Sequence, residues 1–149
     1  MINERIMIEE KTKDYNEAWI ETYFWQESEE LYPGQKRPVI VICPGGAYCM
    51  TSDREAEAIA VRFMGMGYHA VVLRYSVAPA RYPVALRQLA KTVALLRENS
   101  DKWHIEKIRS LYPAFRQEAI WQLLWECSGI LRSLPGSREW KTSGSVPMA

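Results

Sequence analysis

The sequence predicts an α/β fold, in which a mixed β-sheet is flanked by helices, and its 149 residues suggest one domain. Two runs rich in β-branched residues, 39–42 and 69–75, are largely apolar without alternation, as expected of strands buried on both faces of a sheet. A helical pattern follows each of these runs, so the chain is expected to cross between parallel strands in the usual right-handed sense.

Strands are expected at five places, in the order β-β-β-α-β-α-β once the helices are included. Arg5 to Glu9 fits a short edge strand, and Ala18 to Trp25 alternates and ends in bulky aromatic residues. The run Val39 to Ile42 is bounded by prolines, and His69 to Tyr75 is the second buried strand. A further strand is expected to begin at Lys107 and Ile108.

The two helices are predicted from their start signals and apolar spacing. Ser52 followed by Glu55 reads as a capping box that opens the first helix, and Gly65 and Gly67 supply its stop signals. The second helix is expected over Val84 to Glu98, where apolar residues recur on one face.

Composition argues against several classes of function. The formal charge of +1 gives no pull towards nucleic acid or an anionic membrane, so neither is an expected partner. Cys43, Cys49 and Cys127 have no metal-binding spacing, so we expect no metal, and nothing indicates a cofactor. An odd cysteine count, with no stretch like a signal peptide or a membrane span, favours a reduced, cytoplasmic protein.

Residues 38–48, P-V-I-V-I-C-P-G-G-A-Y, carry the strongest indication of function. Glycines at the end of a buried strand let a ligand approach the main chain, and open α/β sheets place their ligands at such strand ends. On its own, a Gly-Gly pair is more often an ordinary strand-to-loop turn.

The order of motifs resembles the α/β-hydrolase superfamily, in its acetyl-esterase and xylan-esterase-like branch. The motifs are P-G-G-A-Y, the T-S-D-R-E-A-E helix start, H-A-V-V-L-R-Y-S-V-A-P, Y-P-V-A-L-R-Q-L-A and W-H-I-E-K-I, and they cover roughly residues 15–108. The resemblance implies an ester hydrolase whose substrate is a small-molecule or carbohydrate ester. It also implies that Gly45, Gly46 and Ala47 form the oxyanion loop, with the backbone N–H groups of Gly46 and Ala47 as donors, and that Tyr48 lines the acyl or alcohol pocket.

The catalytic residues of that family are not found in the sequence. After W-H-I-E-K-I the family continues into a G-x-S-x-G elbow that bears the serine nucleophile, followed by an acid and a histidine. No G-x-S-x-G occurs in the 149 residues, and the acid and base would lie beyond residue 149. We therefore expect a truncated, incomplete hydrolase sheet over residues 1–108 and no hydrolase activity. The family's nucleophile strand adjoins the strand at 38–43, so that strand is expected to have an unpaired edge.

A frameshift explains the break. When residues 113–131 are back-translated with permitted codons and read from the third base of each codon, they can spell G-F-S-A-G-G-H-L-A-A-S-L-G-V-F-W-N-P. This is an elbow and the helix behind it, and a chance match of this length is negligible. Residues 109–149 are accordingly expected to be an out-of-frame tail, disordered from about residue 142.

Three other interpretations stay open at this point. The stretch 114–125 is also compatible with a real amphipathic helix, and the tryptophan-rich tail with a small non-enzymatic binding module that docks a partner. A cysteine-based hydrolase would pair Cys43 or Cys49 with His69 or His104, although buried cysteines are commonly inert.

Overall fold

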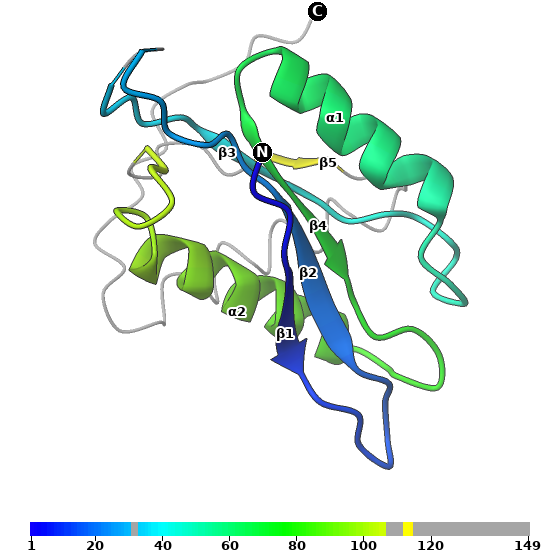
Figure 1. Cartoon of the computed structure of the whole chain (residues 1–149). Coiled ribbons are helices and arrows are strands. Elements are labelled where there is room, and N and C mark those ends of the chain that lie inside the picture. The colour runs from blue at the N-terminus through cyan, green and yellow to red at the C-terminus, as the bar shows by residue number, and fades with distance from the viewer. Residues whose placement is uncertain (31–32, 107–111, 115–149) are drawn as a thin grey trace, which may run out of the picture.

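The structure, a computed structural model, describes residues 1–30, 33–106 and 112–114 (Figure 1). Two strands form an N-terminal hairpin, and two helices connect the strands that follow. In chain order the elements are β1 (Arg5–Glu9), β2 (Ala18–Tyr23), β3 (Val39–Ile42), the 3₁₀ turn η1 (Asp53–Glu55), α1 (Glu57–Gly65), β4 (His69–Arg74), α2 (Val84–Glu98) and β5 (Tyr112–Ala114). The predicted mixed α/β sheet is confirmed.

The five strands form one sheet in the order β1-β2-β4-β3-β5. β1, β2 and β4 pair antiparallel, whereas β4, β3 and β5 run parallel. In the central pair Val39 lies opposite His69 and Ile42 opposite Val72. Strand β3 therefore has a parallel neighbour on each side, and its carboxyl end opens at the same edge of the sheet as that of β4.

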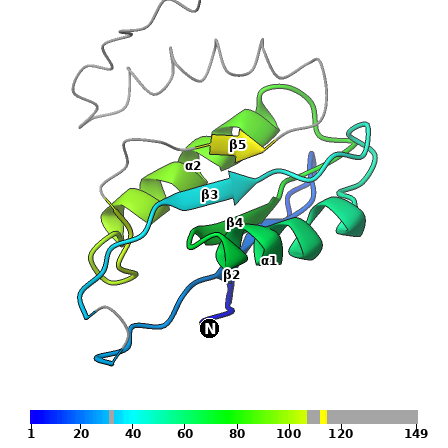
Figure 2. The ribbon, with the colours of Figure 1, turned by 90° about the horizontal axis from the view of Figure 1, so that it is seen from above.

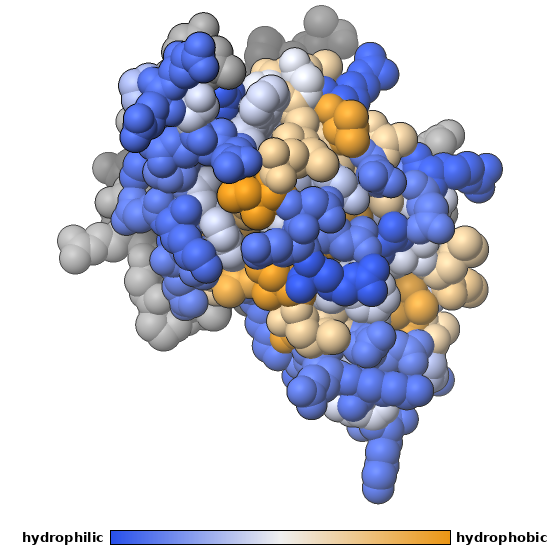
Figure 3. Space-filling model, in the orientation of Figure 1, coloured by the Kyte–Doolittle hydropathy of each residue, from blue (hydrophilic) through white to orange (hydrophobic). Residues whose placement is uncertain are grey.

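The helices cover opposite faces of the sheet, α1 one face and α2 the other (Figure 2). Because side chains alternate along a strand, β3 and β4 contribute to both faces, which explains why their sequences are apolar throughout. The cluster on the α2 side contains Val41, Leu73, Leu89 and Leu96, and the cluster on the α1 side contains small residues such as Ala60 and Ala70. The apolar residues are thus gathered in the interior, while hydrophilic side chains separate the smaller apolar patches on the surface shown in Figure 3.

The predicted capping box is wrong. Ser52 precedes η1 without making a side-chain cap, and the α-helix begins only at Glu57. The carboxylate of Glu55 instead accepts a hydrogen bond from the N–H of Gly45, at 3.0 Å. The loop after β3 therefore competes with the helix start for this side chain, and a 3₁₀ turn replaces the first helical turn.

The expected unpaired edge of β3 is also wrong, because β5 pairs with it. Ile40 lies opposite Tyr112 and Ile42 opposite Ala114. The prediction of a strand start at Lys107 and Ile108, the stretch 114–125 and the out-of-frame or disordered tail concern residues that, apart from 112–114, lie outside the described part of the chain.

Candidate functional site

The candidate site is the turn at residues 44–48, called here the glycine loop, which leaves the carboxyl end of β3. In open α/β sheets the carboxyl ends of parallel strands are where ligands bind, because the connections diverge there and leave a crevice. Pro44 is buried, Gly45 and Gly46 are partly exposed, and the chain reaches the surface at Ala47.

Three successive carbonyl groups of this loop accept hydrogen bonds from within the protein. The carbonyl of Pro44 accepts from the hydroxyl of Tyr75 at 2.7 Å. The carbonyl of Gly45 accepts from the N–H of Ser52 at 2.8 Å. The carbonyl of Gly46 accepts from the N–H groups of Cys49 and Met50, at 3.0 and 3.3 Å. All three carbonyls are thereby turned towards the protein.

The N–H groups of Gly46 and Ala47 consequently point the other way. In a trans peptide the N–H and C=O vectors are opposed, so the two N–H groups point away from the donors that hold the carbonyls of Gly45 and Gly46. Among the described residues, neither of these two N–H groups has a hydrogen-bond partner. Adjacent backbone donors without partners are groups that can bind an anion or a developing oxyanion.

Backbone conformation enforces the arrangement. Gly46 has φ of 154°, and Ala47 and Tyr48 have φ of 53° and 57°. A Cβ atom on Gly46 would lie 2.0 Å from the carbonyl oxygen of Met50, so only glycine fits at that position. Two successive non-glycine residues in the left-handed region are strained, and strain of this kind is concentrated at functional sites.

Tyr48 stands at the outer side of the glycine loop, with 48% of its surface exposed. Its ring contacts that of Tyr75 edge-on at 6.3 Å, and its carbonyl accepts from the N–H of Ala78 at 2.7 Å. Burial raises the pKa of Tyr75 to about 12, so the hydroxyl stays protonated as the donor to Pro44. The two tyrosine rings therefore lie against each other beside the glycine loop.

The structure does not bring Cys43 to either histidine. Cys43 follows the end of β3, whereas His69 pairs with Val39 at its beginning, so the two are separated by about 13 Å along the strands. His104 lies at the same end as His69, since its carbonyl accepts from the N–H of Arg37. Cys43 is buried, and Cys49 is exposed on the loop side. Within the described residues, this geometry separates Cys43 from both imidazoles that a cysteine-based hydrolase would pair with it.

His69 instead lies in the core of the protein. It is 1% exposed, its Nδ1 accepts from the N–H of Trp25 at 3.1 Å, and its ring packs edge-on against Phe24. Burial lowers its pKa to about 4, although the backbone of His104 acts in the opposite direction. His69 is therefore a neutral core residue, as expected of a residue that starts a strand.

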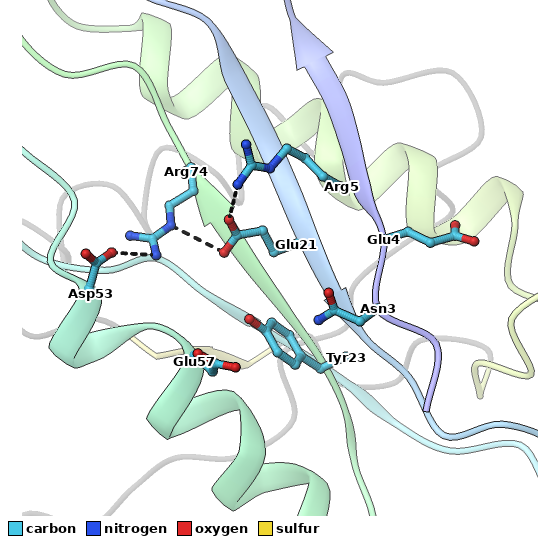
Figure 4. Close-up of a pocket in the computed structure, with 8 residues that line it drawn as sticks. All are labelled: Asn3, Glu4, Arg5, Glu21, Tyr23, Asp53, Glu57 and Arg74. Atoms are coloured by element: carbon cyan, nitrogen blue, oxygen red, sulfur yellow. Dashed lines mark hydrogen bonds and ion pairs between the residues drawn. The ribbon is translucent and has the colours of Figure 1, made fainter.

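A charged hollow of about 290 Å³ lies away from the glycine loop, over β1, β2 and the start of α1 (Figure 4). At its edge the guanidinium of Arg74 pairs with Asp53 at 2.8 Å and Glu21 at 3.5 Å, and donates to the carbonyl of Thr51. Arg74 thus ties the far end of the 44–55 connection to the sheet. Within the described ranges no group of three or more His, Cys, Asp or Glu side chains is placed to hold a metal ion.

Sequence reasoning missed the role of Glu55 and the hydroxyl contact of Tyr75. Glu55 is separated from Gly45 by ten residues, and its position after Ser52 favoured a helix cap. Only the path of the loop reveals that its carboxylate returns to the glycine.

Comparison with known proteins identifies relatives of this chain. Over 102 residues the chain is 28% identical to endo-1,4-beta-xylanase B of Butyrivibrio fibrisolvens, covering 55% of this chain and 16% of that protein. It is 31% identical over 72 residues to esterase LipQ of Mycobacterium tuberculosis, covering 47% and 17% of the two chains. No family model matches the sequence.

Solved structures match over a longer range. An α/β-hydrolase enzyme, MGS-M1, from a deep-sea metagenome library superposes with a TM-score of 0.65 at 35% identity, over 72% of this chain and 43% of that one. The carboxylesterase Cest-2923 of Lactobacillus plantarum superposes with a TM-score of 0.62 at 28% identity, over 71% and 38%. This chain spans less than half the length of either structure and about a sixth of the two curated relatives. The described part of the chain is the N-terminal part of an α/β-hydrolase fold, and its relatives in sequence and structure include esterases.

Proposed function

We propose that this chain carries the oxyanion-binding part of a serine carboxylic-ester hydrolase. The observation that supports it is the pair of N–H groups of Gly46 and Ala47 at the carboxyl end of β3, which have no hydrogen-bond partner among the described residues. Two donors fixed before the reaction stabilise the charge that forms on an ester oxygen, each contributing on the order of 3 kcal/mol.

In the intact enzyme a serine oxygen attacks the ester carbonyl while a histidine takes its proton, and the carbonyl oxygen becomes an oxyanion. This chain supplies the oxyanion donors and part of the substrate pocket. Gly46 and Ala47 donate to it, and Tyr48 lines the space for the acyl or alcohol group. Short acyl esters and acetylated sugars are the proposed substrates, in keeping with the resemblance stated above.

The chain itself, as distinct from the intact enzyme, is proposed to be inactive and to result from a frameshift. It contains no G-x-S-x-G, and residues 113–131 can encode that elbow in the shifted frame. The proposed division is therefore a hydrolase part over 1–108 and an out-of-frame segment over 109–149. Strand β5, at Tyr112–Ala114, lies beside β3, on the side where the family's nucleophile strand belongs.

The nucleotide sequence across codons 107–131 tests the proposal directly. Bases that spell the elbow in the shifted frame support a carboxylesterase gene, and bases that exclude it contradict the frameshift. In the second case the tail is a genuine coding segment, and a partner-binding module becomes the better hypothesis.

Activity gives an independent test. We expect no turnover of p-nitrophenyl acetate by the printed chain, and turnover by a protein expressed from the gene with the frame restored. Turnover by the printed chain that disappears in Cys49→Ser would contradict the serine mechanism. Turnover by neither protein, with the elbow present in the restored frame, would contradict the ester-hydrolase proposal.

A further inference from the structure

We infer that Glu55 and Tyr75 are positioning residues that together lock one peptide unit of the glycine loop, and through it the direction of the oxyanion donors. The inference rests on the proposed function, since it assigns these two side chains a part in orienting Gly46 and Ala47.

The two side chains hold the same peptide unit from its two edges. The carbonyl of Pro44 and the N–H of Gly45 belong to a single planar group. Tyr75 donates to that carbonyl at 2.7 Å, and the carboxylate of Glu55 accepts from that N–H at 3.0 Å. A flip of this plane would break both bonds at once, one of them to an ionised group, and bonds to ionised groups are among the stronger ones in proteins.

The two residues reach the peptide unit from different elements. Glu55 ends η1, and Tyr75 follows the last residue of β4. Tyr75 is anchored in turn, because the preceding residue, Arg74, is ion-paired to Glu21 of β2 and Asp53 of η1. The peptide unit is thus fixed to the sheet on one side and to the start of α1 on the other.

The contact with Glu55 also explains why a glycine occupies position 45. A Cβ atom there would lie 2.8 Å from Oε2 of Glu55, so a side chain would displace the carboxylate. Gly46 is needed for its conformation, with φ of 154°, whereas Gly45 is needed for the close approach of Glu55. The two glycines of the motif therefore have separate tasks.

The consequence concerns the donors that follow. The direction of the Gly46 N–H depends on the torsions of Gly45, whose own N–H is fixed by Glu55, and on its carbonyl bond to Ser52. A loop held in this way meets the transition state without reorganising, which is the condition under which backbone donors accelerate a reaction. Loss of either positioning residue should lower kcat more than it changes KM, because the donors act on the transition state.

The kinetic test uses the frame-restored enzyme with p-nitrophenyl acetate. We expect Tyr75→Phe and Glu55→Gln each to lower kcat by about tenfold with KM changed less than about twofold, and Glu55→Ala to lower it further. Tyr68→Phe and Glu57→Gln are matched controls, since Tyr68 packs on Phe63 and Glu57 lies two residues from Glu55 on the exposed side of α1. Variants at 55 and 75 that behave like these controls would overturn the inference.

Amide hydrogen exchange in the printed chain separates this inference from the proposed function. We expect Glu55→Ala to speed exchange at Gly45 by at least about tenfold, Glu55→Gln to restore part of the protection, and the amide of Val71 within β4 to stay protected. Unchanged exchange at Gly45 overturns the positioning role, whatever the activity. If the frame-restored enzyme is inactive but exchange at the Gly45 amide still responds to Glu55→Ala, the proposed function is contradicted. The positioning role of the two residues then stands.

Discussion

The two ends of the β3–β4 pair differ in how they treat polar groups. At the amino end, the buried ring of His69 accepts from the N–H of Trp25, and the indole N–H of Trp25 donates to the carbonyl of Met64 at 3.1 Å. At the carboxyl end, the carbonyls of the glycine loop accept hydrogen bonds, while the N–H groups of Gly46 and Ala47 have no partner in the part of the chain that the structure describes. Among the described residues, the amino end leaves one buried side-chain atom unpaired, Nε2 of His69, whereas the unpaired groups at the carboxyl end are adjacent backbone donors.

The comparison shows why function is expected at one end only. All of β3 is buried, and so is β4 up to Leu73, so burial does little to distinguish the ends. What distinguishes them is two successive non-glycine residues in the left-handed region, Ala47 and Tyr48, whereas His104 at the amino end is a single one.

The largest effect is expected from a side chain at the carboxyl end. Gly46→Ala should lower the free energy of unfolding by about 3–5 kcal/mol, because it adds steric overlap with Met50 to an unfavourable φ. Urea unfolding measures this change. Gly65→Ala, at the last residue of α1 with open space around it, is the control and should stabilise by up to about 1 kcal/mol. Equal effects of the two variants would contradict the difference between the ends.

The next largest effect is expected in the pH dependence of stability, through His69 at the amino end of the β3–β4 pair. Since the folded pKa of His69 is about 4, below its ordinary value of 6.5, the folded state binds this proton less readily than the unfolded chain. Stability from His69 is present in full above pH 6.5 and is lost as the pH falls towards 4, by about 3 kcal/mol in all. His69→Gln should remove that part of the loss.

The wild type must be compared with His69→Gln at each pH, because other groups also titrate. Burial would raise the pKa of Glu9, but hydrogen bonds from Lys91 and Gln88 outweigh burial and lower that pKa. The protein therefore also loses the stabilisation from Glu9 in acid. Identical pH profiles for the wild type and His69→Gln would show that the ring is not held neutral.

A smaller effect is expected where the 44–55 connection is tied to the sheet. Arg74→Gln should cost about 2 kcal/mol, since the guanidinium is mostly buried and holds two carboxylates and the carbonyl of Thr51. Arg5→Gln is the matched control, because Arg5 pairs with the same Glu21 but its side chain is 64% exposed, and it should cost no more than about 0.5 kcal/mol. Thermal unfolding of both variants compares them, and a larger loss for Arg5→Gln would refute this ranking.

The smallest effect is expected at Trp25. Trp25→Phe removes the indole donor to Met64 and weakens the stacking of Arg37 at 5.0 Å, for a cost of about 1 kcal/mol. Because the backbone N–H of Trp25 still donates to His69, the pH dependence described above should persist. Loss of that dependence in Trp25→Phe would mean that the indole, rather than burial, sets the state of the ring.

The sheet was largely predictable from the sequence, and the site only in part. Val39–Ile42 and Val84–Glu98 have the bounds that periodicity predicted, because burial leaves a direct trace in the choice of residues. The helix start at Ser52 was wrong because Glu55 has a tertiary partner, Gly45, that no local pattern encodes. Gly46 and Ala47 were named from a resemblance, and their role as donors stays a prediction.

The location of the loop's supports along the chain has a consequence for biosynthesis. Every side chain described as orienting the glycine loop, from Glu55 to Tyr75, precedes residue 76, and so do the paired strands β3 and β4 that flank this segment. A ribosome therefore completes the whole support before it reaches the codons for residues 107–131. Under the proposed function, a change of reading frame in those codons would remove the nucleophile and leave the glycine loop with all of its described supports.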